Sequence, residues 1–187
     1  MDPRERWFYV AVFFGMLPTA AGSSYYHLAP DNDRLVWDRL PMTIVFMSLV
    51  AAMIAERICV RVALWLWPIL IAIGILSVLQ WHWSEQARHG DLRFYAAVQV
   101  YAVLVLFLVL FLPARYSHSS YLGIVVGFYV LAKLLETFDQ QVFAIGHIVS
   151  GHTLKHIVAG FAGYGILKML ERRKKASPPA LPRNLHA

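Results

Sequence analysis

Six long apolar stretches constrain this chain more than any other feature of its sequence. A helix needs about 20 mostly apolar residues to cross a bilayer core of about 30 Å, and each stretch reaches or approaches that length. The stretches occupy residues 7–28, 40–58, 62–81, 92–112, 121–135 and 147–170. Prolines and charged residues separate them, such as Pro30 with Asp31 and Pro113 with Arg115. The sequence therefore predicts an all-α, polytopic transmembrane bundle of six helices.

The composition agrees with a membrane protein and argues against several other classes. Apolar residues make up 59% of the chain and charged residues 15%, whereas an ordinary soluble domain has about 45–50% and about 25%. Such a chain is too apolar to be disordered, and its single cysteine, Cys59, cannot form a disulfide scaffold. We expect one transmembrane domain over residues 7–171, a short N-terminal tail over 1–6 and a basic C-terminal tail over 172–187.

The distribution of Lys and Arg predicts the orientation of the bundle. Six helices would place both termini on one side, and eleven of the 17 Lys and Arg residues lie near that side. Four lie near the opposite side, where Lys133 and Lys155 are predicted to be buried nearby. Positive charge favours the cytoplasmic side, so both termini are predicted to be cytoplasmic. The compact chain suggests a bacterial inner membrane, and basic charge alone is too weak a signal to predict a nucleic-acid partner.

The first apolar stretch also has features of a cleaved signal peptide. Arg4 and Arg6 precede the apolar run, and small residues follow it at 19–22. Cleavage would leave His27 near a free N-terminus. We favour a retained helix, because His27 completes a histidine cluster that the predicted topology creates.

Two histidines on the last predicted helix are the strongest local signal for chemistry. His152 and His156 are four residues apart, so their rings share one face of a helix. One helix can supply two metal ligands at that spacing, although an isolated HxxxH pattern more often holds two unrelated histidines. His27 lies at the end of the first helix, on the side where the last helix begins. The topology therefore brings all three histidines to one membrane depth as predicted metal ligands.

Three histidines and a water form an open zinc site, and imidazole suits zinc better than it suits calcium or magnesium. Zn²⁺ is therefore the predicted cofactor, and it would lower the pKa of a bound water from about 15.7 toward 7. Asp38, just before the second predicted helix, is expected to act as base or proton shuttle. Ser23, one turn before His27, is expected to hydrogen-bond the water or an oxyanion. His147 is expected to be an interfacial or supporting residue, because a fourth histidine would close the site.

At these residues the sequence resembles the alkaline ceramidases. Residues 22–27 (GSSYYH) with 37–42 (WDRLPM) are similar to that family's paired motif, and residues 152–160 with Tyr164 are similar to its last-helix motif. The family belongs to a wider superfamily of membrane hydrolases that includes adiponectin-type receptors. The resemblance implies zinc held by His27, His152 and His156, with Ser23 and Asp38 in contact with the metal-bound water.

The resemblance covers residues 22–43 and 147–165, and the chain departs from the family pattern in several ways. No helix precedes the Ser23–His27 motif, so we predict six helices instead of seven and no calcium site. Arg39 stands where ceramidases often have an acid, and Lys155 stands where an aromatic residue is common. Either cation suits a phosphate or carboxylate headgroup. Lys133 and Glu136, three residues apart, are predicted to form an ion pair on one helix face.

The resemblance implies a zinc-dependent hydrolase that cleaves the amide bond of a ceramide-like or other N-acyl lipid near the extracytoplasmic side. Ester hydrolysis remains an alternative at the level of sequence. A non-hydrolytic receptor-like or sensor protein with a structural zinc is a second alternative, and a haem protein with His27 and His156 as ligands is a third. Intramembrane ionisable clusters are usually functional, which favours the enzyme.

Overall fold

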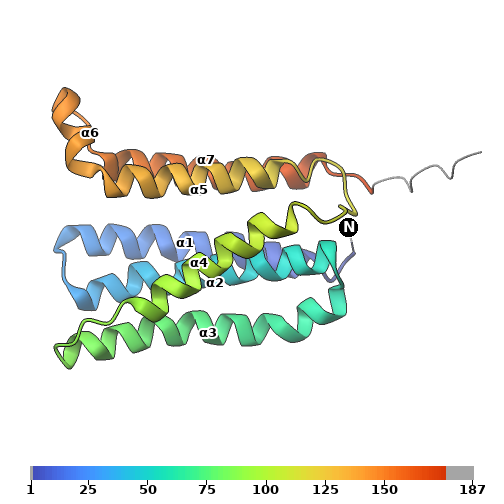
Figure 1. Ribbon diagram of the computed structural model, residues 1–187, viewed down its shortest axis with the longest axis horizontal. Helices are drawn as coiled ribbons and strands as arrows, with labels where there is room; N and C mark the ends of the chain where they lie inside the picture. The colour runs from blue at the N-terminus through green and yellow to red at the C-terminus, as the bar shows by residue number, and fades with distance from the viewer. Residues whose placement is uncertain (1, 176–187) are drawn as a thin grey trace, which may run out of the picture.

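The computed structural model describes residues 2–175, and these form seven α-helices and no β-strand (Figure 1). The helices are α1 (Arg6–Leu28), α2 (Asn32–Arg57), α3 (Val60–Gln86), α4 (Arg93–Val109), α5 (Tyr121–Thr137), α6 (Asp139–Gly146) and α7 (Gly151–Arg172). The all-α prediction is confirmed. Most of the predicted basic tail, residues 176–187, lies outside the described residues, as does Met1.

The six predicted helices are all present, but the helix count was wrong because the short helix α6 was not foreseen. The start of α2 also differs: it begins at Asn32, not at residue 40, so Asp38 lies inside the helix and not just before it. The cause is an N-cap, because the Asp31 carboxylate accepts a hydrogen bond from the Arg34 backbone N–H at 2.7 Å. The last helix begins at Gly151, where the Ser150 hydroxyl accepts from the Thr153 N–H.

Helices α5 and α6 form a bent pair at the end of the molecule opposite the termini. The chain turns by 79° between them, so α6 projects from the end of the α5–α7 pair, away from the other helices in the view of Figure 1. His147 ends α6 in a left-handed conformation with φ 54°. The bend sets where α7 starts and thereby positions the two histidines near its N-terminus.

Helix α2 is the centre of the packing. It lies against α1 and α3 along their length and contacts α4 more lightly, while α5 pairs with α7. The main hydrophobic core draws buried residues from all six long helices, for example Phe8, Met47, Leu122 and Met169. A second, smaller core contains Val78, Trp81 and Tyr95, packed against α2 only. All six long helices therefore share a core, whereas the second core joins only α2, α3 and α4.

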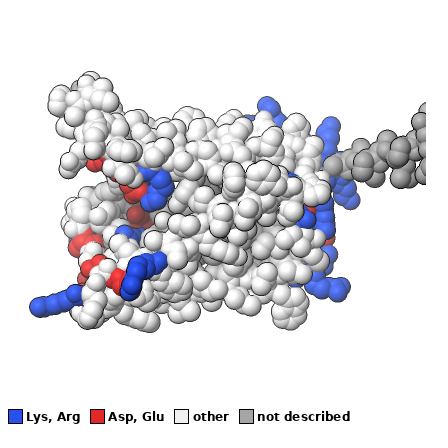
Figure 2. All heavy atoms as spheres, viewed as in Figure 1, with Lys and Arg blue, Asp and Glu red and all other residues white. Residues whose placement is uncertain are grey.

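The surface has the pattern of a protein that lies in a membrane. On the face shown in Figure 2, charged side chains gather at the two ends, and the band between them is almost uncharged. Large apolar side chains are exposed within the helices, including Trp65 at 77%, Leu17 at 73% and Phe14 at 69%. By length and composition α2 and α3 can each span a membrane, and the bent pair α5–α6 makes a third candidate. These features are compatible with a membrane protein.

A buried ionic network closes the end that carries both termini. Glu5 and Glu56 are each only 2% exposed. The Tyr116 hydroxyl donates to Glu5 Oε2 at 2.9 Å, and Arg173 Nη1 donates to Glu56 Oε2 at 3.1 Å. Buried charges need such partners, because an uncompensated one is strongly destabilising. The network ties the C-terminal end of α7 to α1 and α2.

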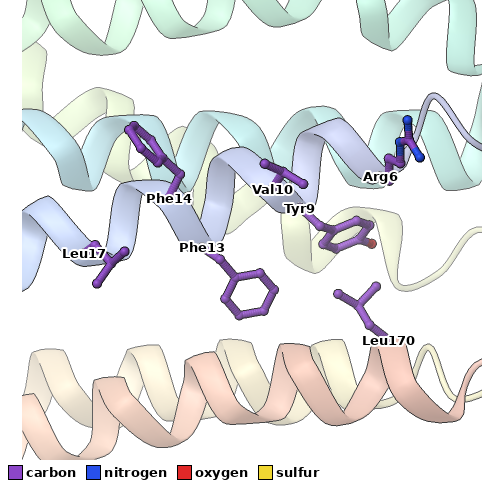
Figure 3. A pocket seen from close by; sticks show the side chains of 7 residues that line it. All are labelled: Arg6, Tyr9, Val10, Phe13, Phe14, Leu17 and Leu170. Atoms are coloured by element: carbon purple, nitrogen blue, oxygen red, sulfur yellow. The ribbon is translucent and has the colours of Figure 1, made fainter.

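An apolar groove of about 490 Å³ runs beside this network, between α1 and α7 (Figure 3). Its lining comes from α1 side chains between Arg6 and Leu17 and from Leu170 of α7. The lining contains no histidine, serine or carboxylate. The groove is therefore separate from the residues that the sequence singled out for chemistry.

Candidate metal centre

The three predicted ligands converge at the end of the bundle opposite the termini. His27 is the second-last residue of α1, and His152 and His156 lie in the first two turns of α7. Nε2 of His152 is 2.8 Å from Nε2 of His27 and 3.1 Å from Nε2 of His156. One ligand nitrogen from each ring lies within 4.8 Å of the others. The expected proximity is therefore present, while metal binding itself stays a prediction.

The donor set and its geometry fit a zinc ion. Zinc binds imidazole at about 2.0–2.1 Å, which places tetrahedral ligand nitrogens about 3.3 Å apart. The Nε2 separations of 2.8 and 3.1 Å need only small ring movements to match this value. A neutral imidazole nitrogen either donates or accepts, and His152 Nε2 lies within hydrogen-bond distance of two other ring nitrogens, so a shared cation would satisfy the cluster better. His27 and His156 are exposed, which leaves one side of the cluster open.

Ser23 adds a buried hydroxyl one turn before His27. The residue is 7% exposed, and its Oγ has no hydrogen-bond partner among the described residues. A buried polar group without a partner is rare and costly, so it calls for an explanation. A water or substrate oxygen at the histidine cluster would supply the missing partner.

Asp38 brings a carboxylate to the same end of the bundle. It lies in the second turn of α2 and is close enough to His156 to act on that ring electrostatically. Within residues 2–175 its carboxylate forms no hydrogen bond and no ion pair. No described residue therefore occupies the Asp38 carboxylate, and its role in proton transfer stays a prediction.

Gly22 explains how Ser23 and Asp38 come together. A Cβ atom at position 22 would overlap the backbone carbonyl of Trp37 and lie against the Asp38 nitrogen. Helices α1 and α2 therefore touch backbone to backbone at this point, which only glycine permits. The contact lies directly beside both predicted catalytic residues.

Replacing Gly22 with alanine is expected to destabilise the protein by about 1–3 kcal/mol, because a backbone carbonyl cannot move aside as a flexible side chain can. The measurement is unfolding of the detergent-solubilised protein by heat or denaturant. Gly160→Ala is the matched control, since a Cβ there meets nothing within 4 Å. Similar losses in both variants would contradict the close approach at Gly22.

The N-terminus of α7 is held by a residue whose role the sequence did not indicate. Asp139 Oδ1 accepts a hydrogen bond from the His152 backbone N–H at 2.6 Å. Gly151 packs against the Leu135 carbonyl, where a side chain would not fit. Both contacts depend on the bend between α5 and α6. The Ser150 cap was recognisable in the sequence as a serine before a helix, but the Asp139 contact was not.

Four further residues that the sequence singled out lie in α5, after α6 and in α7. The predicted Lys133–Glu136 ion pair is confirmed, at 2.7 Å, and Lys155 of α7 joins the same carboxylate at 2.8 Å. His147 is exposed and is not part of the histidine cluster.

No protein-family description, no curated protein and no solved structure matches this chain. The resemblance to alkaline ceramidases therefore stays a hypothesis that rests on the motif residues. The functional argument depends on the geometry of the histidine cluster and the two polar residues beside it.

Proposed function

We propose that this chain is a zinc-dependent membrane hydrolase that cleaves the amide bond of a ceramide-like or other N-acyl lipid. The proposal rests on one observation: three imidazole nitrogens from α1 and α7 lie within 4.8 Å of one another, and one turn before His27 on α1 a buried serine hydroxyl has no partner among residues 2–175. In this proposal the six long helices span a bacterial inner membrane and both termini are cytoplasmic. The histidine cluster then lies near the extracytoplasmic side.

Each of the five residues has a defined task in this reaction. His27, His152 and His156 hold the zinc, which when bound supplies Lewis acidity and activates water at neutral pH. Asp38 takes a proton from the attacking water and delivers it to the amide nitrogen. Ser23 donates a hydrogen bond to the oxygen that becomes negative as the carbonyl is attacked. A C–O bond forms, the C–N bond breaks, and the products are a fatty acid and an amine.

The open side of the cluster favours the hydrolase over a receptor-like protein with a structural zinc. Structural zinc sites are closed by four protein ligands, whereas catalytic sites keep one position for water or substrate. The cluster found in residues 2–175 contains three histidines, two of which are exposed. Asp38, with no ion pair to any described residue, supplies the base that a structural site does not need.

The proposal is tested by metal analysis joined to a lipid screen. Protein purified in detergent is expected to hold close to one zinc per chain and to release fatty acid from N-acyl lipids, read by mass spectrometry. A chelator should remove both properties, and zinc should restore them while calcium and magnesium should not. Comparing each amide lipid with the ester of the same acyl chain shows whether the protein cleaves amides or esters. A Soret band in the absorption spectrum would reveal haem. Zinc-free protein that retains full activity would rule out this mechanism.

A further inference from the structure

Arg39 lies in an unusual setting, one residue after Asp38 on α2. Its guanidinium carbon lies 4.1 Å from the centroid of the Trp81 ring and 5.0 Å from that of the Tyr95 ring. These aromatic residues come from α3 and α4. The cation is therefore fixed in place by cation–π contacts with two further helices.

The hydrogen-bonding groups of Arg39 are not satisfied by the protein. Nη1 is buried without a partner, and no described residue forms a hydrogen bond or ion pair with the guanidinium. Three other cations at this end have carboxylate partners: Lys133 and Lys155 share Glu136, and Arg34 pairs with Asp31 at 3.2 Å. Asp38 and Glu136 act on this partly buried cation without contacting it, so a directly bound anion from outside the chain would stabilise it.

A guanidinium held in this way suits a particular kind of ligand. Its donors lie in the plane of the group and match the two oxygens of a carboxylate or phosphate. The contacts with the faces of the Trp81 and Tyr95 rings use none of its N–H donors in a hydrogen bond to a described residue. Arg39 therefore has the geometry of an anion-binding residue and not only that of a packing residue.

Arg39 lies at the same end of the bundle as the candidate metal centre and is connected to it through intervening residues. Asp38, Tyr26 and Glu136 all lie near enough to act on its charge. Tyr26 contacts the His27 ring, with centroids 5.1 Å apart. Glu136 pairs with Lys155, which lies between the two histidines of α7 in the sequence. On the face shown in Figure 2 the surface is hollowed at this end, with acidic and basic side chains on its walls. Arg39 and the histidine cluster therefore share neighbouring side chains at one end of the bundle.

We propose that Arg39 binds a carboxylate or phosphate on the headgroup of the lipid whose acyl linkage lies at the histidine cluster. The preferred lipid is then an anionic one, such as an N-acyl amino acid or an N-acyl amine with a phosphate, and not a neutral ceramide. Cleavage of this lipid rests on the proposed hydrolase function. Binding of its anionic headgroup by Arg39 does not, so cleavage and binding are tested separately.

The binding test uses three non-cleavable ligands with one oleyl chain: oleyloxyacetic acid, 2-(oleyloxy)ethyl phosphate and the neutral 2-(oleyloxy)ethanol. Equilibrium binding is measured on the full chain in nanodiscs made of zwitterionic lipid. Arg39→Gln is expected to lower the affinity for one or both anionic ligands by about 10- to 100-fold. This is the range for loss of a charge-assisted hydrogen bond. The affinity for the neutral ligand should change by less than about twofold. The carboxylate and phosphate arms show which anion the site prefers.

Arg34→Gln is the matched control, because Arg34 also lies on α2, stacks on Tyr25 and has its charge neutralised by Asp31. It is expected to leave all three affinities unchanged. Arg39→Lys keeps the positive charge but loses the planar guanidinium with its paired N–H donors. It should therefore lower the affinity for the anionic ligands less than Arg39→Gln does. It also provides the test if Arg39→Gln does not fold. Equal weakening of all three ligands, or no change in any, would overturn the proposal and leave Arg39 a packing residue.

A second measurement separates this proposal from the hydrolase proposal. N-oleoylglycine and N-oleoylethanolamine are compared as substrates of the zinc-loaded protein, and Arg39→Gln is expected to raise KM for the anionic amide alone. If neither amide is cleaved while the ether ligands still bind through Arg39, the hydrolase proposal fails and the anion site stands. If both amides are cleaved equally well and Arg39→Gln affects neither, the anion site fails and the hydrolase stands.

Discussion

Replacing His152 with alanine is expected to remove both zinc and lipid hydrolysis. Its Nε2 lies between those of His27 and His156, at 2.8 and 3.1 Å, so its loss leaves two ligands on different helices. Changing residues that merely orient ligands lowers metal affinity about 10- to 100-fold, and loss of a ligand should exceed that. Elemental analysis measures the zinc, and fatty acid release measures the activity, which should fall to the background rate.

His147→Asn is the matched control for His152→Ala. His147 lies five residues earlier but ends α6 in the left-handed region, outside the cluster, and asparagine tolerates that conformation. Zinc content and turnover are expected to match the unchanged protein. Full zinc content in His152→Ala would place the metal elsewhere, and loss of zinc in His147→Asn would identify a fourth ligand.

The histidine cluster was predictable because two independent patterns agree on it. The four-residue spacing of His152 and His156 puts them on one face of α7, and the alternation of apolar stretches puts His27 at the same end of the bundle. Both arguments need only helix periodicity and the order of helices along the chain. They do not depend on side-chain packing, which explains why they could succeed without a structure.

The contacts that support the cluster could not be predicted in the same way. Helix α6 has only eight residues and a mixed composition, so periodicity does not reveal it. The contact of Asp139 with the His152 N–H follows from a 79° bend that no local pattern encodes. Gly22 looked like part of a small-residue run before a cleavage site, yet it marks a backbone-to-backbone contact between α1 and α2.

Helix boundaries account for one avoidable error. The hydropathy pattern placed the second helix at residue 40, because Asp31 to Arg39 include five charged residues. The structure extends α2 back to Asn32, where Asp31 caps it and Asp33 lies in the first turn. An acidic N-cap followed by an acid in the first turn is a recognised helix start. These residues therefore predict a helix start that places Asp38 within α2.

Asp38→Asn separates the hydrolase from the receptor-like alternative. The amide has nearly the shape of the carboxylate but cannot accept the proton of the attacking water. Loss of a general acid–base group lowers turnover by about 10²- to 10⁴-fold. Zinc content and thermal stability should hardly change, because Asp38 is not among the clustered ligands and has no ion pair with any described residue. Fatty acid release and elemental analysis on the same preparation measure both quantities.

Asp33→Asn is the matched control, because Asp33 lies on the same helix but is exposed and faces His82 at 3.7 Å. Its turnover is expected to equal that of the unchanged protein. A receptor-like protein has no proton to transfer, so both variants would then keep zinc and behave alike in any assay. Loss of zinc with Asp38→Asn would instead make Asp38 a ligand, since a metal bound by three histidines does not depend on a carboxylate that never touches it. Only low turnover with full zinc assigns Asp38 to proton transfer.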